Sequence, residues 1–178
     1  MKHKVLDKSD RNEVARLFLS VFTSSEGAQE GRLLGNLAAE LSSKADNQEI
    51  ICLGAFEEDA LIGSIFFTRL LVNGRVLGYM LAPVAVDARH QGRGVGRALI
   101  EYGLEELKAR GVAVVVTYGD PGFYSKVGFE TLSENVIQAP LRLSMPEGWL
   151  GLSLTDEPIP TVDGRPACVR EFHDPVYW

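Results

Sequence analysis

Residues 83–99 constrain the fold of this chain more than any other segment. A short apolar run, Pro83-Val84-Ala85-Val86, stands directly before a glycine-rich turn, and a helical pattern of leucines follows at once. The first turn of a helix leaves backbone N–H groups unpaired and carries the positive end of the helix dipole, and glycines let an anion come close to that backbone. Arg89, Arg93 and Arg97 add positive charge. The segment therefore predicts a strand, a polyphosphate-binding turn and a helix in succession.

Upstream of this segment, the sequence predicts a short strand, two helices and a meander. The strand is expected at Val5 and Leu6, and Ser9 or Asp10 is expected to cap a first helix that ends near Thr23. A second helix should end where Ser42 to Asn47 form the exit. Strands are predicted over 49–57, 61–72 and 75–86. Because Asn73-Gly74 is typical of a tight hairpin turn, these strands are expected to pair antiparallel.

Downstream of the glycine turn, the pattern predicts a parallel crossover. A helix should stop at Arg110-Gly111, and Val112 to Thr117 should form a strand buried on both faces. A short helix over 121–127 and a strand start over 129–131 are expected next. We expect strands between about 136 and 178 to complete the same domain, so that 1–178 form a single α/β (α+β) domain.

Composition limits the classes of partner. The 178 residues include 18 Lys or Arg and 24 Asp or Glu, a net charge of −6, which disfavours a surface devoted to nucleic acid or anionic lipid. No membrane span or secretory signal is recognised, so a cytoplasmic location is expected. Cys52 and Cys168 are interpreted as reduced core thiols, and the three histidines are too scattered for a metal site.

The glycine pattern excludes two common nucleotide loops. A dinucleotide fingerprint that begins at Gly92 would need glycine where Arg97 stands, and a P-loop would need Lys and a hydroxyl residue after its last glycine. What remains is Gln91-x-x-Gly94-x-Gly96, which resembles the acetyl-CoA pyrophosphate loop of the GNAT acetyltransferases. A second segment, Tyr124-x-Lys126-x-Gly128-Phe129, is similar to a motif of the same superfamily. Gly119-Asp120-Pro121 before it resembles a bacterial branch whose members mostly lack an assigned substrate.

This resemblance covers essentially the whole chain and implies the GNAT fold: a mixed central sheet with an antiparallel meander, a splayed parallel strand pair and flanking helices. It implies acetyl-CoA as cosubstrate and no metal. The pantetheine arm is expected between the splayed strands, on the backbone around Val84 and Val86. The residues that the resemblance assigns to acetyl-CoA are Val84, Ala85, Val86, Arg89, Gln91, Gly92, Arg93, Gly94, Val95, Gly96, Arg97 and Tyr124.

The resemblance also implies roles in catalysis. The Val84 N–H is expected to polarise the thioester carbonyl, and Tyr124 is expected to protonate the departing sulfur, since a phenol with a pKa near 10 stays protonated at neutral pH. The strand before the loop has no carboxylate to act as base, so Glu30 or a chain of waters is proposed instead. Glu57, Glu58 and Asp59 are interpreted as a solvated hairpin tip, and His90 as facing phosphate or solvent.

The leading hypothesis is an N-acetyltransferase that acts by direct attack of a primary amine in a ternary complex. The alternative is a catalytically weak acyl-CoA-binding or sensing module, and a nucleotide-binding protein without CoA ranks last. The acceptor amine is not specified by the sequence. A homodimer is compatible with it but has no sequence signal of its own.

Overall fold

The computed structural model describes residues 1–178, and the chain packs as two compact units. One unit holds Met1–Phe67 and Pro83–Gly103, and the other holds Thr68–Ala82 and Leu104–Trp178. Seven strands form one mixed sheet in the order β1-β2-β3-β4-β5-β7-β6, with β3 (Ala60–Val72) and β4 (Arg75–Val86) contributing to both units. This sheet, with its flanking helices, is the architecture that the sequence predicts.

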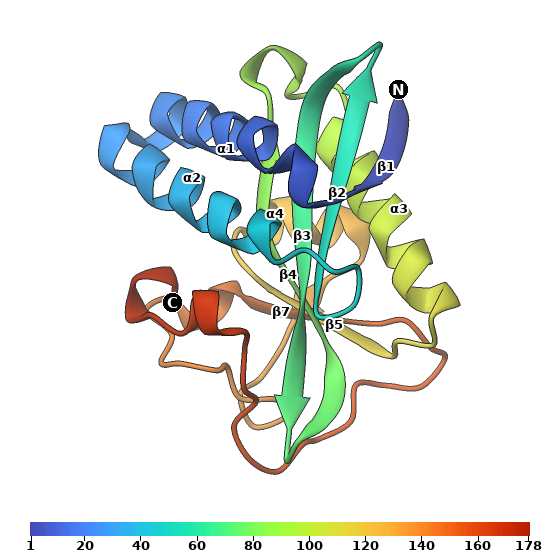
Figure 1. Ribbon diagram of the computed structural model, residues 1–178. Coiled ribbons are helices and arrows are strands. Elements are labelled where there is room, and N and C mark those ends of the chain that lie inside the picture. Colours follow the sequence, from blue (N-terminus) through green and yellow to red (C-terminus); the bar gives the residue numbers. More distant parts are fainter. The chain divides into compact units, whose positions relative to one another are not determined.

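In the first unit, helices cover both faces of the strands. Helices α1 (Arg11–Glu26) and α2 (Ala28–Ser43) lie side by side (Figure 1), and the Phe18 ring of α1 is 5.8 Å from the Phe66 ring of β3. Phe67, the next strand residue, packs against Gly103 of α3 (Val95–Ala109). Because successive strand residues point to opposite faces, α1 and α2 cover one face and α3 covers the other.

Two tight turns join β2 to β3 and β3 to β4. At Asn73-Gly74 both residues have positive φ, 51° and 75°, which is the conformation of a two-residue hairpin turn. The turn predicted there is confirmed, and β4 has the predicted bounds. Strand β2 (Ile50–Glu57) joins β3 through a turn at Glu58-Asp59, and β1 (Lys2–Leu6) pairs antiparallel with β2.

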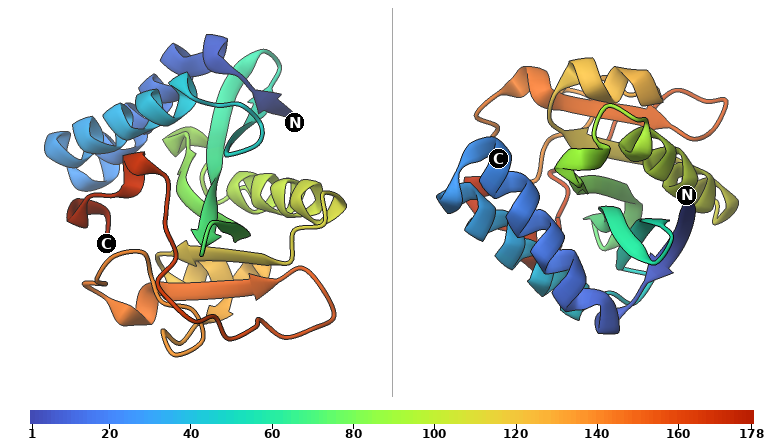
Figure 2. Two further views of the ribbon diagram at one scale, coloured as in Figure 1. Left: turned by 60° about the horizontal axis from the view of Figure 1, so that its bottom comes forward. Right: turned by 90° about the horizontal axis from the view of Figure 1, so that it is seen from above.

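In the second unit, β5 (Val114–Tyr118) pairs in parallel with β4 and antiparallel with β7 (Trp149–Ser153). Figure 2 shows β7 beside β5. The two-residue β6 (Glu130–Thr131) pairs with the other edge of β7. The crossover from β4 to β5 is thus confirmed. The strands expected between 136 and 178 reduce to β7 alone, and an isolated antiparallel bridge joins Ala167 to Leu71 of β3.

Helix and strand ends near the N-terminus differ from the prediction. Strand β1 begins at Lys2 instead of Val5, and α1 extends past Thr23 to Glu26 because no helix breaker occurs before Gly27, which has φ of 101°. The Asp10 carboxylate does not cap α1; it accepts a hydrogen bond from the Asp7 N–H at 2.9 Å.

Two tryptophans are buried in the second unit and donate hydrogen bonds to its backbone. The Trp149 indole N–H donates to the Ile137 carbonyl at 2.9 Å, and the Trp178 N–H donates to the Phe172 carbonyl at 2.8 Å. Their rings lie 6.2 Å apart, and both residues are buried. These aromatics therefore belong to the core, the commoner fate of such residues. No helix combines the length and hydropathy that a bilayer-spanning segment requires.

Gly31 of α2 lies close against α1. A methyl group at Gly31 would contact the Thr23 side chain and would lie 2.8 Å from the Thr23 backbone nitrogen and 2.9 Å from the Leu19 carbonyl oxygen. We predict that Gly31→Ala destabilises the protein by about 2 kcal/mol, since overpacking outweighs the gain of about 1 kcal/mol in helix propensity. Denaturant midpoints measure this change. Asn36→Ala, at an exposed position of the same helix, should leave the midpoint unchanged or raise it slightly.

Candidate active site

The glycine-rich turn forms the start of α3. A short 3-10 turn (Ala88–His90) follows β4, and Gly92 and Gly94 then adopt φ of 72° and 81°, a region that L side chains rarely occupy. The Ala98 N–H donates to the Gly94 carbonyl at 2.9 Å and closes the first helical turn. The N–H groups that precede it lie at the positive end of the helix dipole. The structure thus brings the predicted loop residues, 91–97, together at a helix N-terminus.

Each arginine of the loop has a carboxylate partner. Arg89 Nε lies 3.1 Å from Asp87 Oδ1, Arg97 Nε lies 2.8 Å from Glu101 Oε1, and Arg93 Nη2 lies 3.5 Å from an oxygen of Glu57. The side chains of Arg89, Arg93 and Arg97 remain 84%, 57% and 62% exposed. The three cations are therefore paired yet accessible to an anionic ligand.

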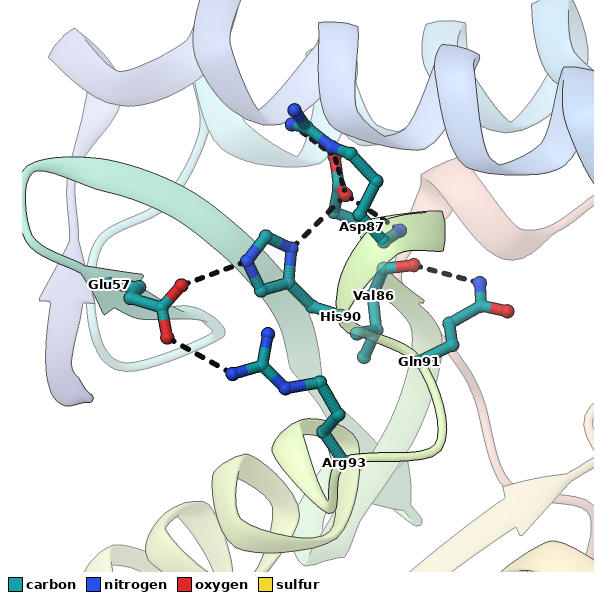
Figure 3. A network of polar contacts seen from close by, with 7 residues as sticks. Glu57, Val86, Asp87, His90, Gln91 and Arg93 are labelled. Carbon is teal, nitrogen blue, oxygen red and sulfur yellow. Dashed lines mark hydrogen bonds and ion pairs between the residues drawn. The ribbon is translucent and has the colours of Figure 1, made fainter.

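His90 lies between two carboxylates (Figure 3). Its Nε2 is 3.0 Å from Glu57 Oε2, and its Nδ1 is 3.2 Å from Asp87 Oδ1. The ring is only 13% exposed, so the expectation that His90 faces solvent is wrong, while its alternative, that His90 faces phosphate, stays a prediction. Glu57 is 48% exposed beside the hairpin turn, in line with its interpretation as a solvated charge, and its carboxylate also contacts His90 and Arg93. No local sequence pattern reveals these contacts, since Glu57 and His90 are 33 residues apart in the sequence.

Asp87 organises the start of the loop. Its Oδ1 accepts a hydrogen bond from the Arg89 backbone N–H at 3.0 Å, which caps the 3-10 turn. Hydrogen bonds from the Arg89 side chain, with smaller contributions from the Arg89 backbone and His90, lower the pKa of Asp87 to about 2. The carboxylate is therefore ionised at every physiological pH.

The end of β4 lies beyond its ladder with β5. The parallel pairs are Tyr79–Val115, Met80–Val116 and Leu81–Thr117, and the ladder does not extend to Ala82 and Tyr118, although both strands contain the next residue.

The next residues of β4 differ in exposure. Ala85 is 1% exposed, whereas Val84 and Val86 are half-buried. The Val86 carbonyl accepts a hydrogen bond from Gln91 Nε2 at 2.9 Å, which ties the loop to the strand end.

Tyr124 belongs to the second unit, at the end of α4 (Pro121–Tyr124). This one-turn helix begins at Asp120, whose carboxylate accepts a hydrogen bond from the Gly122 N–H at 2.9 Å. The Tyr124 ring packs edge-on against Phe129 and passes close to Gly119, where a methyl group would lie 2.8 Å from the ring. The short helix predicted over 121–127 is confirmed as α4 and a following 3-10 turn.

The Tyr124 hydroxyl forms a hydrogen bond with the Thr117 side chain. Thr117 is buried and donates its own hydroxyl proton to the Leu81 carbonyl at 2.7 Å. Burial, together with the nearby charge of Asp120, raises the pKa of Tyr124 above its ordinary value near 10. Tyr124 is thus a neutral proton donor at physiological pH.

The remaining candidates lie apart from these hydrogen bonds. Glu30 is half-buried in the first turn of α2, where the helix dipole favours a carboxylate. Burial raises the pKa of Cys52 to about 12, so this thiol is packed and not a nucleophile. Cys52 and Cys168 are both free. No group of three or more His, Cys, Asp or Glu side chains has the arrangement of a metal site.

Comparison with known proteins identifies relatives over most of the chain. The model of the acetyltransferase (GNAT) domain family matches residues 2–132. YjhQ, an uncharacterized N-acetyltransferase of Escherichia coli K12, is 31% identical over 171 residues, which cover 92% of this chain and 90% of YjhQ.

Solved structures agree with this match. A GNAT family N-acetyltransferase (YhbS) from Escherichia coli in complex with CoA has a TM-score of 0.79 and 27% identity, covering 97% of this chain and 92% of that chain. A GNAT family acetyltransferase from Brucella melitensis in complex with acetyl-CoA has a TM-score of 0.70 and 25% identity, covering 96% and 97% of the two chains.

Asp87 should stabilise the protein in a pH-dependent way. Because its pKa falls from 3.8 to about 2 on folding, the stabilisation is present above about pH 4 and is lost as the pH falls toward 2. We predict that Asp87→Asn is less stable at pH 7, by about 1 kcal/mol or less, because the amide oxygen can keep the cap but the ion pair with Arg89 is lost, and that the difference shrinks in acid. Thermal unfolding between pH 2 and 7 measures it. Asp59→Asn, in the exposed β2–β3 turn, should show the pH dependence of the unmodified protein.

Proposed function

Because the chain belongs to the GNAT acetyltransferase family, we propose that it transfers the acetyl group of acetyl-CoA to a primary amine. The acceptor is a small molecule or an exposed amino group, and the amine attacks directly in a ternary complex. The observation that carries this proposal is the loop 91–97, with its positive-φ glycines, free helix N-terminus and accessible arginines. Two similar structures contain CoA or acetyl-CoA, which supports the same ligand here.

We assign the pyrophosphate of CoA to the N-terminus of α3. The backbone N–H groups of this turn suit phosphate oxygens, since they are unpaired in the helix and lie at its positive end. The residues proposed to bind the pyrophosphate through backbone or side chain are Arg89, Gln91, Gly92, Arg93, Gly94, Val95, Gly96 and Arg97. The backbone of Val84, Ala85 and Val86 would pair with the pantetheine arm as a strand does.

Transfer requires an oxyanion donor and an acid. The amine nitrogen attacks the thioester carbon, and the Val84 N–H stabilises the oxyanion of the tetrahedral intermediate. The C–S bond then breaks, and Tyr124 gives its proton to the CoA thiolate, while the amine proton leaves to a base. The raised pKa of Tyr124 supports the role of acid, because the phenol remains protonated until the thiolate forms.

The base is proposed to be Glu30, directly or through water. Its place in the first turn of α2 leaves the carboxylate partly exposed, so it can exchange protons with solvent. We further propose that the two compact units work as one GNAT domain over 1–178, in the bacterial branch marked by Gly119-Asp120-Pro121.

Gly94→Glu tests the CoA site. The variant places a side chain and a negative charge in the loop, and we predict that micromolar acetyl-CoA binding, measured by calorimetry, is lost. Gly111→Glu is a matched control, because Gly94 and Gly111 have φ of 81° and 79° and neither has a neighbour within 4 Å of an added Cβ. The control should bind normally. Absence of binding by the unmodified protein would refute the proposed function.

Tyr124→Phe tests the acid. The substitution removes one hydroxyl, so acetyl-CoA affinity should be unchanged, while acceptor-dependent thiol release should fall by about 100-fold or more. The assay uses an amine that an initial screen shows to support turnover. Tyr102→Phe, which removes a hydroxyl from a residue of α3 that packs against His3, should retain full turnover. Full turnover in Tyr124→Phe would show that another group protonates the thiolate.

A further inference from the structure

Glu57 holds the glycine-rich loop from outside the loop. It is the last residue of β2, and its two oxygens contact different loop residues: Oε2 lies 3.0 Å from His90 Nε2, and Oε1 lies 3.5 Å from Arg93 Nη2. Figure 3 shows both contacts on one carboxylate. The strand end therefore fixes the side chains on either side of Gln91 and Gly92.

Side-chain contacts must hold this loop in place, because its glycines have no side chains that could form such contacts. We call these contacts anchors. Gly92 and Gly94 have no side chains, and added Cβ atoms there would meet nothing within 4 Å. The side-chain anchors at positions 90–93 are the Gln91 amide on the Val86 carbonyl, the His90 contact with Asp87 and the two contacts with Glu57. Two of these four anchors thus end on Glu57.

The His90 contacts set a condition on its charge. Ionised carboxylates only accept hydrogen bonds, and the two ring nitrogens face Glu57 from β2 and Asp87 from the loop start. Both contacts are hydrogen bonds at once only when both nitrogens carry protons. The other charges of this network are Arg93, on Glu57, and Arg89, on Asp87. The complete set of anchors therefore requires the imidazolium form.

We propose that Glu57 is a positioning residue for the pyrophosphate loop, acting through His90 and through Arg93. This inference rests on the CoA site proposed above. Glu57 itself is not a ligand for phosphate, since two anions repel. The longer contact, to Arg93, can be exchanged for a phosphate oxygen while the shorter contact keeps His90 in place.

The test compares charge removal at two adjacent residues. Glu57→Gln and Glu58→Gln each remove one negative charge from the same hairpin, but no ion pair to the loop involves Glu58. If Glu57 only repels the ligand, both variants should bind CoA as tightly as the unmodified protein or more tightly. If it positions the loop, Glu57→Gln alone should bind about threefold to tenfold more weakly in calorimetry, as expected for the loss of partly exposed contacts.

Two substitutions separate the contacts of His90. His90→Asn keeps a donor near the Nδ1 position and can reach Asp87, whereas His90→Gln keeps one near Nε2 and can reach Glu57. His90→Gln should therefore bind more tightly than His90→Asn. These variants also keep the inference testable if Glu57→Gln does not fold.

The pH profile distinguishes this role from a merely structural one. Dephospho-CoA serves as the probe because it lacks the phosphate monoester that titrates near pH 6. Its affinity for the unmodified protein should fall as the pH rises and the second ring proton of His90 is lost, and the profile should be flatter for His90→Asn. Equal profiles, or unchanged affinity in Glu57→Gln, would overturn the positioning role alone. Failure of the unmodified protein to bind CoA would instead overturn the proposed function.

Discussion

The end of the β4–β5 ladder is the constraint on which the proposed chemistry depends. Parallel pairing stops at Leu81 and Thr117, although each strand has a further residue. Backbone groups of a strand that loses its partner must bond elsewhere, because an unpaired buried amide is costly. In the function proposed above, the pantetheine arm of CoA would meet this need by pairing with β4 as a strand does. The backbone groups that the interrupted ladder leaves without a strand partner could then hydrogen-bond to the ligand.

The last ladder pair also carries the proposed acid. Thr117 donates its hydroxyl proton to the Leu81 carbonyl and forms a hydrogen bond with the Tyr124 side chain, so these contacts link Tyr124 to the backbone of β4. The acid is therefore oriented by the same two residues at which the ladder ends. Gly119 permits the close approach of the Tyr124 ring, and Asp120 begins the helical turn that carries it. The Gly-Asp-Pro segment thus has a local structural reason that is independent of any substrate.

Local patterns predicted most of the fold, and long-range pairing accounts for the rest. The bounds of β4, the Asn73-Gly74 turn and the helix at 121–127 follow from signals within a few residues, such as positive-φ positions and N-caps. The insertion of β7 between β5 and β6 and the bridge from Leu71 to Ala167 do not, because nothing near those residues specifies the partner. For the same reason, the sequence did not reveal that Glu57 contacts His90 and Arg93. The loop motif is contiguous and visible, whereas its anchor lies on a different strand.

Pairing of the loop arginines with Asp87, Glu57 and Glu101 explains how a basic loop persists in a chain of net charge −6. Three unpaired cations close together would repel one another, and their carboxylate partners remove that repulsion before any ligand arrives. Surface ion pairs contribute about 1 kcal/mol or less, so a phosphate that forms charge-assisted hydrogen bonds with the same guanidinium groups can replace them at small cost. The backbone N–H groups of α3 have no such competitors. We therefore expect the proposed pyrophosphate site to gain most of its affinity from the helix N-terminus, while the arginines hold their positions through partners that they can exchange.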